Sequence, residues 1–371
     1  MSSFQKAVPR SSLSGTKLKN NIPYVSSGIP SLDFIVGGGL PLGSIFAVEE
    51  DVLGSYSRVL SKYFLAEGVV CKHGLFVASA DENPKLIIQE LPTPCTVQED
   101  KTNQDVNSEM KIAWRYEGLG QVESSFGSNT NFGHHFDLSR HMEELALRDV
   151  DLTYCHLKPN NGKSNGDLYT VILYIWFRNR LYHDLLKEIG KVLSKEEYRS
   201  GSKNKNILRI SIQCLGSPVW LATDCDHDSK YGQDLIKLIY SLRVLIRDTN
   251  AVVFITIPEH LFENNQIMKR LLYSIDNAVR IESFAGSSKE TNPVYSEYHG
   301  LFHISKLSGV SSLVAFVPPS LDLAFKLKRK KFVIEKLHLP PELQESSERE
   351  QDDVTATPGT CGGFKKKDID F

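Results

Sequence analysis

Short apolar runs alternate with longer amphipathic stretches along most of the chain, and turn residues separate them. Residues 44–50 ("SIFAVEE") and 74–80 ("GLFVASA") are apolar runs of the length and composition of buried strands. Between them Leu60, Tyr63, Phe64 and Val70 recur at helical spacing. A strand, a helix and a strand within about 35 residues predict a βαβ unit with two parallel strands.

The same alternation continues toward the C-terminus. Strands are predicted at 207–217 ("ILRISIQCLGS") and 251–258, with a helix at 233–249 between them, and further strands at 111–117, 277–284 and 300–307. A long amphipathic helix is predicted at 168–193. About seven strands with helices between most of them predict an α/β fold with a mainly parallel twisted sheet, helices on both faces and an antiparallel edge formed by the late strands.

Composition marks the segments outside this pattern. Residues 1–22 are rich in Ser and Lys without periodicity and predict a disordered arm, and 344–371 predict a disordered tail. One domain is expected over 23–343, with a loop-rich insertion at about 118–165, where Gly, Ser, Asn and His dominate.

Charge and cysteine content narrow the classes of function. The 371 residues carry 43 Lys and Arg against 45 Asp and Glu, so contact with nucleic acid requires a local basic patch. The six cysteines form no C-x-x-C pair, which favours a reducing compartment over a disulfide scaffold or a zinc ribbon. No apolar run approaches the roughly 20 residues of a membrane span. We therefore expect a soluble intracellular protein.

The loop after the first strand stands where a nucleotide-binding loop is expected. A working P-loop reads G-x-x-x-x-G-K-[ST], because backbone N–H groups cradle phosphate, the lysine reaches the terminal phosphates and the hydroxyl holds Mg²⁺. Here the stretch is "EEDVLGSYS": Glu50 replaces the first glycine, Gly54 and Ser55 follow, Tyr56 replaces the lysine, and Ser57 keeps the hydroxyl. Glu50 places a carboxylate where a phosphate would bind, and Glu49 and Asp51 add negative charge beside it. Two like charges at about 4 Å repel by roughly 4 kcal/mol at an effective dielectric near 20.

A second catalytic position is also changed. The acid that serves Mg²⁺ in such ATPases ends a buried strand, and the strand at 207–217 offers Gln213 there. We therefore expect no catalytic residues and no ATP hydrolysis by the chain alone.

The run "SSGIPSLDFIVGGGLPLGS" resembles the entry to RecA-type ATPase domains. Together with "KYFLAEG", "MKIAWRY", "NILRISIQCLGSPVW", "ESFAGSSKETNPVYSEYHGLFHI" and "LAFKLKRKKFVIEKLHLPPEL", it makes the chain, from about residue 25 to 343, resemble the Elongator complex protein 4 family. That family is RecA-like without intact Walker motifs. Departures from the family lie mostly in 118–165, where little is recognisable beyond "FGHHFDLSRHM".

The resemblance implies a non-catalytic subunit of the Elongator accessory subcomplex. Its partners would be the fifth and sixth Elongator proteins, in a heterohexameric ring that binds tRNA and supports modification of the wobble uridine (U34) by the core Elongator subunits. No cofactor of its own is implied, and ATP would bind only at subunit interfaces of the ring. Residence in both cytoplasm and nucleus is implied. Two alternatives stay open: a RecA-like ATPase with an unusual nucleotide pocket, and a transcription-associated scaffold without RNA contact.

Two clusters are candidates for contact with RNA or a partner. The first is basic: Lys326, Lys328, Arg329, Lys330 and Lys331. It either grips phosphates or forms the solvated face of a segment whose Leu323, Leu327 and Ile334 pack inward. The second lies in "NPVYSEYHG" and comprises Tyr295, Tyr298 and His299. By analogy with ring ATPases, it would face a neighbour or the central channel.

Other polar or aromatic groups receive a structural interpretation. The aromatic residues of "YIWFRNRLY" have helical spacing and are expected to pack, while Cys225 with His227, and His134 with His135, are interpreted as polar loop residues rather than metal ligands. We therefore expect no metal site. Arg243, Arg247 and Arg270 are the arginines that could complete a neighbour's ATP site, and the sequence does not choose among them.

Overall fold

The computed structural model describes residues 13–95, 132–157, 177–202, 205–221, 231–262, 265–307, 309, 316–328 and 330–338. The chain divides into two units, Met1–Lys336 and Leu337–Phe371, and the helices and strands among the described residues lie in the first. The expected strand at 111–117, the C-terminal tail and residues 1–12 lie outside the described residues.

A nine-stranded sheet forms the centre of the first unit. Its order is β14-β13-β12-β11-β4-β10-β9-β5-β8, and neighbours are parallel from β11 to β8. The parallel strands are β4 (Ile45–Glu49), β5 (Gly74–Ser79), β8 (Leu152–His156), β9 (Leu208–Ile212), β10 (Ala251–Ile257) and β11 (Asn277–Ser283). The predicted strands at 44–50, 74–80, 207–217, 251–258 and 277–284 are confirmed, and so is the mainly parallel α/β fold.

The other end of the sheet is antiparallel, as the pattern predicted. β12 (Gly300–Lys306) runs antiparallel to β11, and β13 (Leu323–Leu327) and β14 (Phe332–Lys336) continue the edge. β13 and β14 were not recognised as strands in the sequence. Their apolar residues Leu323 and Ile334 pack inward, and Leu327 packs against the same core from a partly exposed position.

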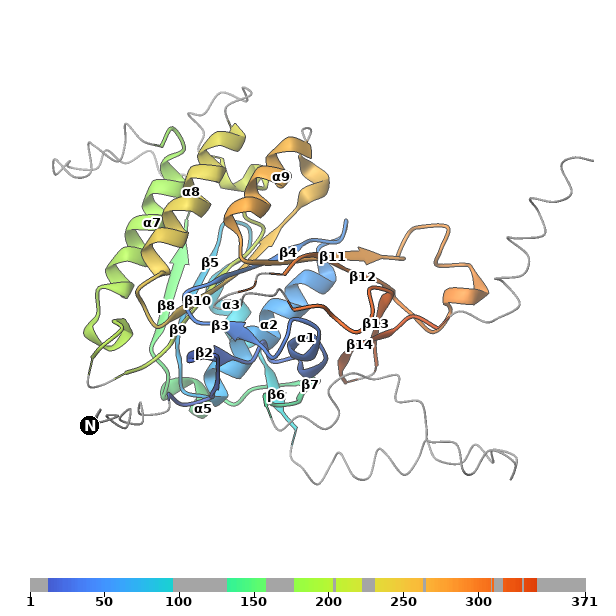
Figure 1. Ribbon diagram of the computed structural model, residues 1–371, viewed down its shortest axis with the longest axis horizontal. Helices are drawn as coiled ribbons and strands as arrows, with labels where there is room; N and C mark the ends of the chain where they lie inside the picture. The colour runs from blue at the N-terminus through green and yellow to red at the C-terminus, as the bar shows by residue number, and fades with distance from the viewer. Residues whose placement is uncertain are drawn as a thin grey trace, which may run out of the picture. The chain divides into compact units, whose positions relative to one another are not determined.

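Helices cover both faces of the sheet (Figure 1), and strand residues alternate between two cores. On one face α2 (Ser55–Val70), with α1 (Pro30–Ile35) and α3 (Pro84–Gln89), packs on side chains such as Phe46 and Phe254. On the other, α7 (Arg180–Leu193), α8 (Tyr231–Ile246) and α9 (Asn265–Ser274) pack on Ala47 and Ile255. This double cover explains why the parallel strands read as continuous apolar runs rather than as an alternation.

Two boundaries expected from composition are wrong. Within 1–22, β1 (Thr16–Lys19) pairs with β2 (Ile22–Val25), and β2 pairs with β3 (Leu40–Pro41). Within 118–165, β7 (Phe136–His141) pairs with β6 (Pro92–Pro94), α5 (Glu144–Arg148) follows, and β8 joins the main sheet. Polar composition hid these elements because edge strands and a short helix bury few side chains.

The helix expected at 168–193 is confirmed from Arg180 onward, where α7 begins; residues 177–179 are not helical, and 168–176 lie outside the described residues. Asn179 caps it by accepting a hydrogen bond from the Leu181 N–H. Phe177 and Tyr182 are buried, and Tyr182 packs near Trp220, which confirms packing for this part of the aromatic run.

Candidate functional site

The loop of residues 50–54 connects β4 to α2 at the carboxyl edge of the parallel strands. Open α/β sheets bind ligands at this edge, and P-loops hold phosphate at the helix start there. Gly54 has φ +63°, a left-handed conformation that glycine adopts without strain, and it turns the chain directly into α2. The strand, loop and helix of a nucleotide site are therefore all present.

The anion position at the start of α2 is taken by the chain's own Asp51. Its carboxylate accepts hydrogen bonds from the backbone N–H groups of Ser55 and Tyr56, both at 3.2 Å, and a longer one from that of Ser57 at 3.4 Å. Asp51 is only 3% exposed. These donors are among the four N–H groups that a helix leaves without an internal partner, and they are the groups that would face a phosphate. A carboxylate thus stands in for the phosphate.

The two groups on the magnesium side of the site, Ser57 and Gln213, also make hydrogen bonds within the chain. The Ser57 hydroxyl is buried and donates to the Gly54 carbonyl at 3.0 Å. Gln213 follows β9 directly, where the sequence placed it, and its Nε2 donates to the Ser61 hydroxyl at 3.3 Å. An amide offers no charge to a divalent cation, so neither group provides what Mg²⁺ needs.

Two further carboxyl groups lie at this carboxyl edge of the parallel strands and make it less favourable for a phosphate. Glu49 and Glu50 are both buried, and each has one oxygen without a hydrogen-bond partner. Burial, followed by a contact with Glu259, raises the pKa of the Glu49 carboxyl to about 7. Burial also raises the pKa of Glu50, whose Oε2 accepts from the Cys214 thiol at 3.6 Å, a distance that fits a weak sulfur donor. Three successive acids therefore line the position of a phosphate cradle.

Tyr56, at the position of the missing lysine, joins an aromatic cluster. Its ring lies edge-on to Phe325 of β13 with centroids 4.7 Å apart, and 6.4 Å from the ring of His299. The His299 Nδ1 accepts from the Leu327 N–H at 3.2 Å, and the Lys326 ammonium lies 5.5 Å from the Tyr298 ring centre. The structure thus brings Tyr56 together with His299. It places the candidate residues Tyr298 and Lys326 nearby, where β12 begins and β13 ends.

The basic cluster is largely paired within the chain. Lys326 and Lys328 contact the buried Glu335 carboxylate at 2.5 and 3.4 Å, and Lys330 contacts Asp137 at 3.3 Å. Arg329 lies outside the described residues. Tyr295 packs on Phe284 at 5.0 Å in the short 3₁₀ helix η5 (Pro293–Tyr295). These pairs favour the solvated-face interpretation, although Lys328 remains exposed.

Lys62 and the three arginines considered for a neighbour's ATP site lie away from this loop or pair elsewhere. Lys62 pairs with Glu90 at 2.5 Å, and Arg243 pairs with Asp276 at 3.2 Å. α8 ends at Ile246 and leads into the start of β10, so Arg243 and Arg247 lie near the amino edge of the parallel strands, opposite the loop. Arg270 lies on α9 and is exposed. Cys225 and His227 lie outside the described residues.

Sequence reasoning missed two groups that the fold assembles. It counted Asp51 only as an unfavourable charge, although a carboxylate near a helix start can accept from the N–H groups that the helix leaves free. It also interpreted His134 as a loop residue, whereas its ring Nδ1 lies 3.1 Å from the Glu67 carboxylate on α2.

In the part of the chain that the structure describes, no helix has the length and apolarity needed to cross a membrane.

Comparison with known proteins gives one consistent answer. A family model described as PAXNEB protein matches residues 10–371. Elongator complex protein 4 of Danio rerio is 39% identical over 366 residues, which cover 94% of this chain and 90% of the relative. The proteins of the same name from Xenopus laevis and Homo sapiens are 39% and 38% identical, and the alignments cover 91% and 94% of this chain and 85% and 87% of the relatives.

Proposed function

The chain belongs to the PAXNEB family of Elongator complex protein 4, and from that premise we propose that it is a non-catalytic RecA-like subunit of an Elongator complex. In this proposal it assembles with the fifth and sixth Elongator proteins into a heterohexameric ring. The ring binds tRNA and supports modification of the wobble uridine by the core Elongator subunits, in cytoplasm and nucleus.

The observation that carries the proposal is the Asp51 carboxylate on the three N–H groups at the start of α2. A phosphate could enter only by displacing a buried, hydrogen-bonded anion that is part of the same loop. The two residues before it, Glu49 and Glu50, are buried acids rather than cations, so they offer nothing that would favour a phosphate in place of Asp51. The loop therefore works as a helix cap, and the subunit contributes through assembly rather than through its own turnover.

Any ATP in the ring is then held chiefly by neighbouring subunits. A nucleotide site between RecA-like domains is built from two faces, so a subunit can lack a phosphate cradle and still complete its neighbour's site. Arg270, which is exposed on α9, and Arg247, which is exposed beyond the end of α8, are available for such a role in this proposal.

We propose that RNA or a partner contacts the end of the sheet where β12 begins and β13 ends. Tyr298 and His299 lie there with Lys326 and Lys328, so an aromatic surface and cations occur together. Aromatic rings stack on bases, and cations neutralise phosphates. Since Glu335 already pairs with both lysines, the gain from phosphate contact would be modest per residue.

The test is reconstitution with the fifth and sixth Elongator proteins. The chain alone and the three-protein mixture are compared by native mass measurement, ATP turnover and tRNA binding at two salt concentrations. The proposal expects a six-subunit assembly that binds tRNA and turns over ATP, and no turnover by the chain alone. ATP turnover by the chain alone would favour an ATPase with an unusual pocket. A ring that binds no tRNA would favour the scaffold.

A further inference from the structure

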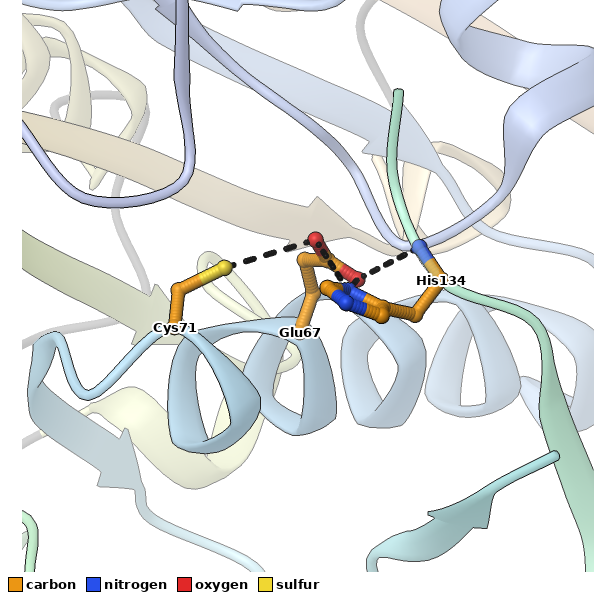
Figure 2. Close-up of side chains that lie close together, drawn as sticks. All are labelled: Glu67, Cys71 and His134. Carbon is orange, nitrogen blue, oxygen red and sulfur yellow. Dashed lines mark hydrogen bonds and ion pairs between the residues drawn. The ribbon is translucent and has the colours of Figure 1, made fainter. Parts of the chain in front are cut away.

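Three potential metal ligands meet on one side of α2, away from the P-loop position. Glu67 and Cys71 are one turn apart on the helix, and His134 comes from the segment that precedes β7. Figure 2 shows the three side chains pointing toward one another, with the carboxylate in the middle. Their ligand atoms all lie within 4.8 Å of one another, and among the described residues no other group of three His, Cys, Asp or Glu does so.

The spacing matches a tetrahedral zinc ion. Zn–S bonds of about 2.3 Å and Zn–O or Zn–N bonds of about 2.0 Å, at an angle of about 109°, place sulfur about 3.5 Å from oxygen and nitrogen about 3.3 Å from oxygen. The Cys71 sulfur lies 3.5 Å from Glu67 Oε1. The His134 Nδ1 lies 3.1 and 3.2 Å from the two carboxylate oxygens. The Cys71 sulfur and the His134 Nδ1 lie within 4.8 Å of each other, and a tetrahedral ion would hold them about 3.5 Å apart.

The surroundings hold the ligands in place and leave one side open. Glu67 and Cys71 are buried, and the main chain at Gly15 packs so closely on the thiol that a β-carbon there would lie 2.4 Å from Sγ. The His134 backbone N–H donates to Glu67 at 3.1 Å, which fixes the approach of this segment. The His134 side chain is 49% exposed, so an ion has an entry path and a solvent ligand can complete the coordination.

Charge determines which ligands the site needs. The fully buried Arg209 guanidinium interacts with Glu67 and Cys71, and its cation opposes a second positive charge nearby. A dication is balanced only when both the carboxylate and a Cys71 thiolate bind it. Burial, with Glu67 beside it, raises the pKa of the Cys71 thiol to about 12, so metal binding must displace that proton.

We propose that Glu67, Cys71 and His134 form a binding site for a divalent metal ion of zinc type, which fastens the C-terminal half of α2 to the segment before β7. The mixed thiolate, imidazole and carboxylate set favours Zn²⁺ over Mg²⁺ or Ca²⁺, which prefer oxygen ligands alone. The site lies at the C-terminal end of α2, whereas the loop of residues 50–54 leads into its N-terminal end, so it is independent of the assembly role proposed above.

The test uses Co²⁺ and Zn²⁺ with the purified full chain at mildly alkaline pH. Titration with Co²⁺ should give a thiolate-to-cobalt charge-transfer band, and stoichiometric Zn²⁺ should remove it and raise the melting temperature. Cys71→Ser should abolish the band. His134→Asn should weaken Zn²⁺ affinity by at least about tenfold, since even outer partners of metal ligands contribute 10–100-fold.

Cys155→Ser is the matched control, because Cys155 is also buried but packs on the opposite face of the sheet. It should keep the band and the affinity. Absence of the band in the wild-type chain, or a band that survives Cys71→Ser, would overturn the proposal. If Cys71→Ser does not fold, the cysteines of the wild-type chain are alkylated in mild denaturant with and without Zn²⁺, and their labelling tests the site instead. Zn²⁺ must protect Cys71 and not Cys155, and equal labelling with and without Zn²⁺ would overturn the site.

Discussion

Replacing Asp51 should destabilise the chain more than any exposed aspartate does. Asp51→Ala removes the acceptor for three backbone N–H groups at the start of α2, of which that of Ser57 is buried. Loss of a helix cap costs about 0.5–2 kcal/mol, and a buried donor left without a partner costs about 1–3 kcal/mol. Water can reach some of these groups once the side chain is gone, so we expect a total of about 2–4 kcal/mol.

Thermal and urea denaturation of the purified chain measure this effect. At about 2 °C per kcal/mol for a large domain, the melting temperature should fall by about 4–8 °C. Asp51→Asn keeps one acceptor oxygen and should lose about half as much. Asp149→Ala is the control, because Asp149 is exposed and pairs with exposed Lys72 at 3.5 Å, a contact worth about 0–1 kcal/mol. Equal stability of Asp51→Ala and Asp149→Ala would refute the assignment of Asp51 as the internal anion.

Two further substitutions test the surroundings of the loop. Tyr56→Ala should cost about 2–3 kcal/mol because it removes the ring that packs on Phe325. Tyr56→Phe should stay within about 0.5 kcal/mol in the same melts, and equal losses for the two would argue against packing as the role of Tyr56. Glu49→Gln tests the buried carboxyl group. With its pKa raised to about 7, folded Glu49 keeps a proton that the unfolded chain releases near its ordinary pKa of about 4.3, so wild-type stability falls as pH rises through that window. The glutamine variant lacks this loss, so its advantage should grow from about pH 5 to pH 8 by up to roughly 3 kcal/mol. A pH-independent difference in urea midpoints, like that expected of the exposed control Glu144→Gln, would contradict the assignment.

The central sheet could be predicted from the sequence because its strands are buried on both faces. Runs such as "SIFAVEE" and "AVVFITIP" read as strands without reference to their neighbours. β8 could not be found in this way, because Leu152 and Thr153 are only partly buried and Tyr154 is exposed. β13 was hidden by Lys326 within it and Lys328 just after it, which both pair with Glu335 of the neighbouring strand. That pairing depends on which strands are adjacent, and the local pattern does not specify it.

The candidate site was only half predictable. The replacement of the lysine by Tyr56 and the loss of an acid at Gln213 follow from matching a motif to the chain. The role of Asp51 does not, because it depends on the three-dimensional path from Asp51 through Gly54 into the helix. The convergence of Tyr56 with His299 joins residues more than 240 positions apart, and the meeting of Glu67 with His134 spans 67 positions.

Direct nucleotide binding by the isolated chain tests the central claim, that Asp51 already occupies the phosphate position. Calorimetry with Mg²⁺–ATP compares the wild-type chain with Ser57→Ala and Asp51→Asn. The account predicts no saturable binding by the wild-type chain and no difference between it and Ser57→Ala. Saturable Mg²⁺–ATP binding by the wild-type chain that Ser57→Ala abolishes would show that the cradle is open, and would contradict the account.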